Sequence, residues 1–225
     1  MAEVAGSPDR REVIRDAAAE LFAAKGVAAT TVREIADAVG ILSGSLYHHF
    51  KSKQDIVEEI LAGYFDDLRS GYASVLSEPR SPAEQLRSLI GSSLETVSRH
   101  VHAAEIYQGD YGYLQTLPHF GDLKSVAGDI QKAWLDVINA GVASGDFRHD
   151  VDPSIFYRLI RDSVWLSVRW YRARADYPAA QFADDTASVF LQGFANRRPP
   201  GWPVVQSSGA TGLPDHRPSS TPSMP

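Results

Sequence analysis

Residues 30–53 read TTVREIADAVGILSGSLYHHFKSK and predict two short helices joined by a tight turn. Thr31 is followed three residues later by Glu34, the spacing of a capping box, so the first helix should begin at Thr31. Its apolar residues recur at i, i+3, i+4 and i+7, which gives the helix one buried face: Val32, Ile35, Ala36 and Val39. Gly40 should end the helix, because glycine tolerates the positive φ of a helix terminus.

The second helix should run from Ser43 to Phe50, with Ser43 as its N-cap. Ile41 and Leu42 are too apolar for a solvated loop, so we expect the turn before this helix to be packed. Leu46 should face inward together with Phe50, which leaves the outward face to small, polar and aromatic residues: Gly44, Ser45, Tyr47, His48 and His49. Such a face beside lysines suits the DNA major groove. The stretch therefore predicts a helix-turn-helix.

A hairpin of helices packed only for structural reasons is the alternative. It would account for Ile35 and Leu46 but not for an exposed aromatic residue and histidines beside lysines. We therefore expect DNA contacts from this set: Thr31, Arg33, Ser43, Gly44, Ser45, Leu46, Tyr47, His48, Lys51 and Lys53. Within it, Arg33, Ser45 and His48 suit base edges, and Tyr47, Lys51 and Lys53 suit phosphates.

The same stretch resembles the DNA-binding signature of the TetR-type bacterial transcription regulators. The resemblance is carried jointly by T-x-x-x-I-A-x-x-x-G, S-x-x-L-Y-x-H-F and the trailing K-S-K. It implies a homodimer on palindromic operator DNA, with an interface formed by the last two long helices of each subunit. Leu159, Leu166, Val189 and Phe190 are compatible with that interface and equally with the domain's own core.

Composition restricts the other classes of function. The 225 residues include no cysteine, which excludes disulfides and thiolate chemistry and fits the cytoplasm. The polar N-terminus is no signal peptide, and no apolar run is long enough to span a membrane. We find no nucleophile–base pairing, phosphate loop or metal-ligand spacing, so we expect neither an enzyme nor a cofactor or metal. An enzyme or lipid carrier built on a helical bundle is the alternative class.

The net charge of −6 looks wrong for a DNA-binding protein until it is divided by region. Residues 1–54 hold seven basic and seven acidic residues, so the excess of acid lies entirely in the remainder. Because the local field governs attraction to phosphate, the predicted DNA-binding segment is not disfavoured.

The rest of the chain shows helical periodicity and no alternation typical of strands, so we predict an all-α fold. A three-helix head should be joined by a connecting helix, from Lys53 to about Leu76, to a helical ligand-binding and dimerisation body. We place the head at residues 9–69, the body at 70–197 and a disordered tail at 198–225. Seven of the 13 prolines lie in residues 199–225. Residues 1–8 should form a mobile arm, and the prolines of segment 77–82 should interrupt the helices.

The most informative part of the body is YRLIRDSVWLSVRWYR, residues 157–172, expected within one helix from Ser154 to Arg172. Arg161 and Trp165 share a face of that helix, and Arg172 should continue it. A buried arginine is costly unless an anion meets it. Either Arg161 is tied to a core carboxylate, or it lines a pocket for a ligand with an anionic and an apolar part.

Three segments together are similar to the KstR-type repressors of actinobacteria, in particular to the type that governs breakdown of the last two cholesterol rings. The segments are ATTVREIADAVGILSGSLYHHF, KAWLDVINAGVASGDFRHDVDP and YRLIRDSVWLSVRWYR. The resemblance implies an effector that is a coenzyme A (CoA) thioester of a steroid remnant. We expect it to be bound by Arg161, Trp165, Tyr107, Trp134 and Arg172. The alternative is a TetR-type regulator of fatty acyl-CoA metabolism or of xenobiotic efflux.

Overall fold

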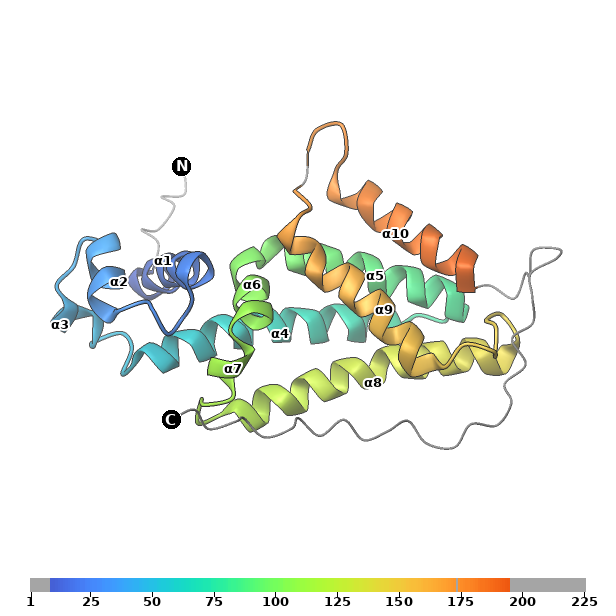
Figure 1. Cartoon of the computed structure of the whole chain (residues 1–225), viewed down its shortest axis with the longest axis horizontal. Helices are drawn as coiled ribbons and strands as arrows, with labels where there is room; N and C mark the ends of the chain where they lie inside the picture. The colour runs from blue at the N-terminus through green and yellow to red at the C-terminus, as the bar shows by residue number, and fades with distance from the viewer. Residues whose placement is uncertain (1–8, 173, 195–225) are drawn as a thin grey trace, which may run out of the picture.

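The computed structural model describes residues 9–172 and 174–194, and most of these are helical (Figure 1). The elements are α1 (Arg10–Lys25), α2 (Val32–Ala38), α3 (Ser43–Leu46), α4 (Lys53–Ser77), α5 (Pro82–Arg99), α6 (Val101–Gly109), α7 (Tyr111–Leu114), α8 (Phe120–Ser144), α9 (Pro153–Trp165), the 3₁₀ helix η1 (Leu166–Arg169) and α10 (Ala179–Phe194). The described residues form no strand, and their β-type pairing is limited to isolated bridges such as the one between Arg174 and Tyr177. The all-α prediction is confirmed; the predicted arm and tail lie outside the described residues.

Local signals set the helix boundaries of the head, which we define as α1–α3 with the first turns of α4. The predicted capping box is present: the Glu34 N–H donates to Thr31 Oγ1 at 3.3 Å, and the Thr31 N–H donates to Glu34 Oε2 at 2.8 Å. Gly26 ends α1 with a φ of 87°. Ser52 caps α4 by accepting from the Asp55 N–H at 3.1 Å.

The head has its own small core, to which every one of its helices contributes. Fully or almost fully buried residues come from α1 (Ile14, Ala18, Phe22), α2 (Ile35, Ala36), the α3 region (Leu46, Phe50) and α4 (Ile56, Val57). Helix α4 then leaves the head and carries buried residues as far as Tyr72. At 1.5 Å per residue its 25 residues span about 37 Å. It therefore connects head and body rigidly, as predicted, and crosses positions 69 and 70 without a break.

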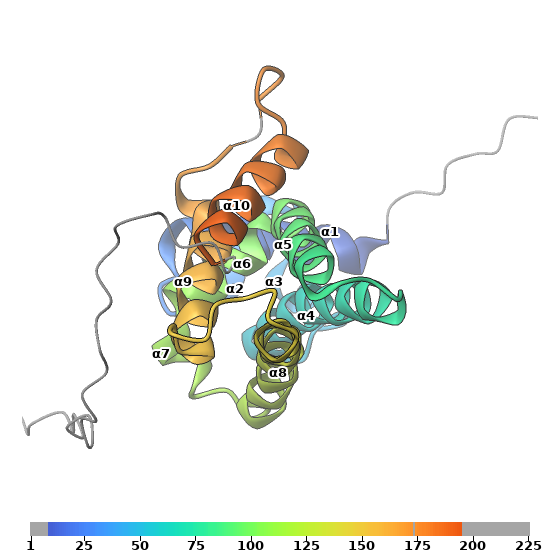
Figure 2. The same cartoon turned by 90° about the vertical axis from the view of Figure 1, so that its right-hand side faces the viewer.

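In the body, α5 packs against α4, α8, α9 and α10, an arrangement that Figure 2 shows end-on. The predicted interruption is present, since α4 ends at Ser77 and α5 begins at Pro82 after the N-cap Ser81. Helix α6 packs against α1, α4 and η1, so it forms the main contact of the body with the head. Among the described residues, no helix is both long and apolar enough to cross a membrane.

The helix predicted from Ser154 to Arg172 is wrong in its second half, because α9 ends at Trp165 and a 3₁₀ turn follows. Ser167 is buried and turns its hydroxyl back to the Val164 carbonyl at 2.5 Å, and the Ser167 carbonyl accepts from the Tyr171 N–H at 2.7 Å. The Tyr171 ring then stacks on Phe182 of α10, with centroids 4.2 Å apart. The chain after α9 thus packs against α10.

The second helix of the helix-turn-helix is also shorter than predicted. It spans Ser43–Leu46 and continues as turns, and its N-cap is Leu42, without a side-chain cap, rather than Ser43. The Leu42 carbonyl accepts the first helical bond, from the Ser45 N–H at 2.9 Å. The expectation of a packed turn is wrong for Leu42, whose side chain is 80% exposed.

Candidate functional site

The outer end of the head presents most of the residues predicted to contact DNA. Arg33 on α2 is largely exposed, with a weak i,i+4 contact to Asp37 at 3.8 Å. Tyr47 is 54% exposed, and Gly44, His48 and Lys51 are also exposed, while Ser43 and Ser45 are half-buried. Together with the exposed Leu42, which was expected to be packed, these residues lie on α2, on α3 and in the turns on either side of α3.

Two residues of the predicted set have other roles. Leu46 is fully buried and anchors α3 to the core of the head. The Nζ of Lys53 donates to the Val27 carbonyl at 2.6 Å and to the Thr30 carbonyl at 2.7 Å. This partly buried position lowers the pKa of Lys53, because burial disfavours the charged form. Lys53 therefore holds the loop between α1 and α2 and is not presented to a phosphate.

Thr31 is exposed, but its hydroxyl is used locally, because it donates to Glu34 Oε2 at 2.8 Å. Lys25 also contacts the Glu34 carboxylate. The hydrogen bond from Lys25, followed by those from Thr31, lowers the pKa of Glu34 to about 2. The start of α2 is thus fixed by a small polar network.

Two arginines of α1, absent from the predicted set, fix the position of the helix-turn-helix. The Arg10 Nη2 donates to the Val39 carbonyl at 2.8 Å. The Arg11 guanidinium lies 4.0 Å from the centroid of the Phe50 ring, donates to the His49 carbonyl and pairs with Glu59. Periodicity could not single them out, because their acceptors are 29 to 48 residues away.

The body contains a cleft between α6, α7, α8 and α9, which we call the effector cleft. One part, of about 260 Å³, is lined by Tyr107, Tyr111, Phe120, Leu123, Lys124, Ala127, Gly128, Gln131, Tyr157, Arg161 and Trp165. An adjoining part of about 300 Å³ is lined by Tyr107, Gln108, Tyr111, Arg161, Asp162 and Trp165. Because the two parts share four residues, they form one site with aromatic walls and two cations, Lys124 and Arg161.

Three of the predicted ligand-binding residues, Tyr107, Arg161 and Trp165, meet in this cleft. The Tyr107 ring lies edge-on to Trp165, with centroids 6.5 Å apart, and to Tyr111 at 6.3 Å. Partial burial raises the pKa of Tyr107, so its hydroxyl stays neutral and can donate a hydrogen bond.

Arg161 is not tied to a core carboxylate. Its Nε donates to Oδ1 of the adjacent Asp162 at 2.8 Å, and its guanidinium lies 5.8 Å from the centroid of the Tyr157 ring. The Asp162 side chain is 52% exposed, and that of Arg161 is 35% exposed. An exposed ion pair of this kind is weak, so an anionic ligand can compete for the guanidinium.

The other two predicted ligand-binding residues lie elsewhere. Trp134 is 1% exposed and packs in the core of the body against Tyr72 and Tyr157, so it does not line the effector cleft. Arg172 donates to the Tyr171 carbonyl at 2.9 Å and lines a separate apolar cavity of about 140 Å³ between α5, η1 and α10. Because α9 ends at Trp165, Arg172 does not continue the helical face that carries Arg161.

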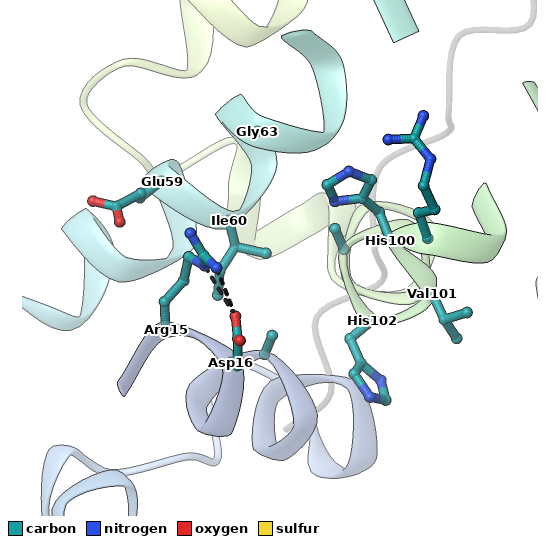
Figure 3. Close-up of a pocket in the computed structure, with 11 residues that line it drawn as sticks. Arg15, Asp16, Glu59, Ile60, Gly63, His100, Val101 and His102 are labelled. Atoms are coloured by element: carbon teal, nitrogen blue, oxygen red, sulfur yellow. Dashed lines mark hydrogen bonds and ion pairs between the residues drawn. The ribbon is translucent and has the colours of Figure 1, made fainter. Parts of the chain in front are cut away.

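A further cavity, of about 350 Å³, marks the seam between head and body, where α1, α4 and the α5–α6 junction meet (Figure 3). Its charged side chains have protein partners. Arg15 pairs with Asp16 at 2.9 Å, and His100 Nε2 lies 2.9 Å from Asp67 Oδ2. Within the described residues no group of three or more His, Cys, Asp or Glu side chains is placed to hold a metal ion. We therefore assign no ligand to this cavity.

The effector cleft is connected to the head by the segment that carries Tyr107 and Tyr111. Between them, Asp110 accepts a hydrogen bond from the Val27 N–H, at the end of α1, at 3.2 Å. Tyr107 also packs edge-on against Phe65 of α4, with ring centroids 5.0 Å apart. A ligand that shifts this segment would therefore act directly on the head.

Comparison with known proteins places the chain in a family. The model described as bacterial regulatory proteins, tetR family, matches residues 14–60, and the one described as a Tetracyclin repressor-like C-terminal domain matches residues 79–194. The HTH-type transcriptional repressor KstR2 of Mycobacterium tuberculosis is 41% identical over 194 residues, which cover 86% of this chain and 97% of that protein.

Solved structures agree with these matches. That of the ketosteroid transcriptional regulator KstR2 of Mycobacterium tuberculosis has a TM-score of 0.80 at 39% identity, and the match covers 85% of this chain and 98% of that one. AibR in complex with isovaleryl coenzyme A and operator DNA has a TM-score of 0.70 over 80% of this chain and 97% of its own, and at 20% identity it shows the fold alone. The resemblance inferred from the sequence is confirmed. The chain belongs to the TetR family of bacterial regulatory proteins.

Proposed function

We propose that this protein is a cytoplasmic transcriptional repressor that binds palindromic operator DNA as a homodimer and is released by a small-molecule effector bound in the effector cleft. One observation carries the proposal: Tyr107, Arg161 and Trp165 line a single cleft. The segment that forms one of its walls also accepts a hydrogen bond from the head, through Asp110. The relative named as the repressor KstR2 supports repression as the direction of control.

DNA recognition falls to the surface around the α2–α3 turn. We assign Arg33, Ser45 and His48 to base edges and Tyr47 and Lys51 to phosphates. A helix as short as α3 offers few base contacts, so selectivity requires two heads on half-sites about 34 Å apart. We keep residues 9–69 as the DNA-binding domain and 70–197 as the ligand-binding and dimerisation domain.

Dimerisation through α9 and α10 is supported by apolar side chains that these helices leave exposed. Ile155, Leu159 and Val189 are 47%, 57% and 71% exposed. Large apolar residues clustered on adjacent helices are typical of a protein interface. Footprinting should therefore protect two half-sites, and sedimentation should give a dimer; a single protected half-site bound by a monomer would contradict the proposal.

The effector we propose is a CoA thioester of a steroid-ring degradation intermediate. Aromatic walls suit a rigid apolar ring system, and Arg161 suits a phosphate or a carbonyl oxygen. The description of KstR2 as a ketosteroid regulator supports the steroid part, and the complex of AibR, a protein of the same fold, with isovaleryl coenzyme A and operator DNA supports the CoA part. A fatty acyl-CoA or a xenobiotic is the alternative effector.

Release of DNA follows from the position of the bound effector. A ligand between Arg161 and the tyrosines pushes on Tyr107 and Tyr111, which flank Asp110. Displacing Asp110 breaks its hydrogen bond with the Val27 N–H and changes the position of α1 relative to the body. Because the two heads of a dimer must match the spacing of the half-sites, a small movement of each head weakens DNA binding.

The test is a release titration of operator DNA with Arg161→Met. Loss of a charge-assisted contact of about 1.5–3 kcal/mol should raise the effector concentration needed for release roughly tenfold to a hundredfold. DNA affinity without effector should stay the same. Arg69→Met, which removes an exposed arginine paired with Asp66 on α4, is the control and should leave the titration unchanged. If Arg161→Met melts early yet responds to effector at the normal concentration, Arg161 is structural. Titration with a straight-chain acyl-CoA separates the alternative effectors.

A further inference from the structure

Helix α8 forms one wall of the effector cleft with an unusual stripe of residues. Lys124, Gly128 and Gln131 all line the cleft, at the i, i+4 and i+7 spacing of one helical face. Phe120, Leu123 and Ala127 of α8 line the cleft beside them, so the α8 wall is partly apolar. Lys124 and Gln131 add polar side chains to this wall, and Gly128 adds none.

Gly128 is the informative member of the stripe. Glycine is the least favourable residue for a helix interior after proline. Where a glycine occurs inside a helix, close packing that leaves no room for a side chain is the usual reason. Packing explains Gly141 of the same helix, where a β-carbon would lie 2.1 Å from the Phe147 ring. A β-carbon on Gly128 would meet no atom within 4 Å. The missing side chain at Gly128 therefore relieves no clash with the protein, and because Gly128 is exposed and lines the cleft, a side chain there would extend into open space at the cleft.

Lys124 lies one turn before Gly128 and is exposed at the cleft. Among the residues that the structure describes, its side chain has no hydrogen-bond or ion-pair partner. Lys132 of the same helix, in contrast, pairs with Asp136 at 2.6 Å. A second cation that lines the cleft with Arg161, and has no carboxylate partner, is suited to an anionic group of a ligand.

We infer that α8 determines which effectors fit the cleft. Gly128 limits the size of the group that can lie against this helix, and Lys124 is, after Arg161, the second contact for an anionic group of the effector. The inference rests on the proposed function and narrows the effector to a rigid fused-ring group joined to an anionic arm. The ring system lies against the α8 backbone at Gly128, where a side chain would exclude it. A thin straight chain would not need this space.

Calorimetric binding of the CoA thioester of a fused bicyclic carboxylic acid tests the size limit. Gly128→Leu should weaken binding at least tenfold, because filling a ligand pocket by a few carbons changes affinity by that order. Its melting temperature should be at least that of the wild type, since leucine favours the helix. Gly121→Leu makes the same change on α8 outside the cleft, where a β-carbon also meets nothing within 4 Å, and should bind like the wild type. Equal affinities of Gly128→Leu and Gly121→Leu would overturn the size limit.

Lys124→Met tests the anion contact, with Lys132→Met as its matched control. Lys124→Met should weaken binding of the thioester about tenfold and reduce the dependence of affinity on salt. Identical affinity and salt dependence in the two variants would overturn the role of Lys124. Operator release, measured on the wild type, tests the proposed function separately. If the thioester binds the wild type without releasing DNA, the proposed function fails. The inference about α8 is then still tested by binding alone, since it requires Gly128→Leu to bind the thioester more weakly than the wild type.

Discussion

Replacing Lys53 by methionine should destabilise the head. Methionine keeps most of the aliphatic stem but removes the ammonium that donates to the Val27 and Thr30 carbonyls at 2.6 and 2.7 Å. Both carbonyls belong to the loop between α1 and α2, where the Val27 carbonyl also accepts from the Thr30 N–H at 3.3 Å. The change therefore leaves the Thr30 carbonyl in need of water and the Val27 carbonyl with one long hydrogen bond.

The size of the effect follows from those two bonds. A hydrogen bond from a charged donor contributes about 1.5–3 kcal/mol when buried, and partial access of water to Lys53 reduces this to about 1–2 kcal/mol each. Together they amount to about 2–4 kcal/mol. For a domain of this size, 1 kcal/mol shifts the melting temperature by about 2–4 °C, so Lys53→Met should melt about 5–15 °C lower than the wild type.

The measurement pairs thermal unfolding with fluorescence anisotropy on operator DNA at several salt concentrations. The control is Lys51→Met: Lys51 is exposed at the DNA-binding surface, and its loss should leave the melting temperature unchanged and lower the salt slope by about one unit. At a temperature where both variants are folded, Lys53→Met should keep the wild-type salt slope. If it melts like the wild type and loses one unit of slope, Lys53 contacts a phosphate and the loop assignment is refuted.

Three further changes test other parts of the structure. Asp110→Ala removes the acceptor of the Val27 N–H, a hydrogen bond worth about 1 kcal/mol. DNA affinity without effector should therefore fall about fivefold, and less effector should be needed for release. No change in either titration would contradict the proposed coupling between the effector cleft and the head. Gly141→Ala should lower the melting temperature by several degrees, because the new β-carbon would overlap the Phe147 ring at a cost of about 1–3 kcal/mol. A higher melting temperature would show that the ring moves freely aside. The folded pKa of Glu34, about 2, lies below its ordinary value of 4.5, so the stability it contributes is complete above pH 4.5 and is lost as the pH falls toward 2. Glu34→Gln should flatten the pH dependence of the melting temperature in that window; an unchanged slope would show that other carboxylates account for it.

The fold could be predicted from the sequence as far as its signals are local. The capping box of Thr31 with Glu34 and the break before Pro82 depend on residues within one helical turn, where hydrogen-bond geometry leaves few alternatives. Arg161 and Trp165 lie four residues apart in α9, so their common face also followed from spacing. The sequence by itself thus determined the all-α class, the helix-turn-helix and the centre of the effector cleft.

Only the tertiary structure decided what those residues contact. Lys53 finds carbonyls 23 and 26 residues away, and nothing in its local sequence separates it from a lysine placed for phosphate. The stacking of Tyr171 on Phe182, in α10, accompanies the early end of α9 and takes Arg172 away from Arg161. The α8 wall of the cleft is visible only once α8 and α9 are packed together. The reason is the same in each case: helix propensity and capping act along the chain, whereas burial and hydrogen-bond partners depend on segments brought together by folding.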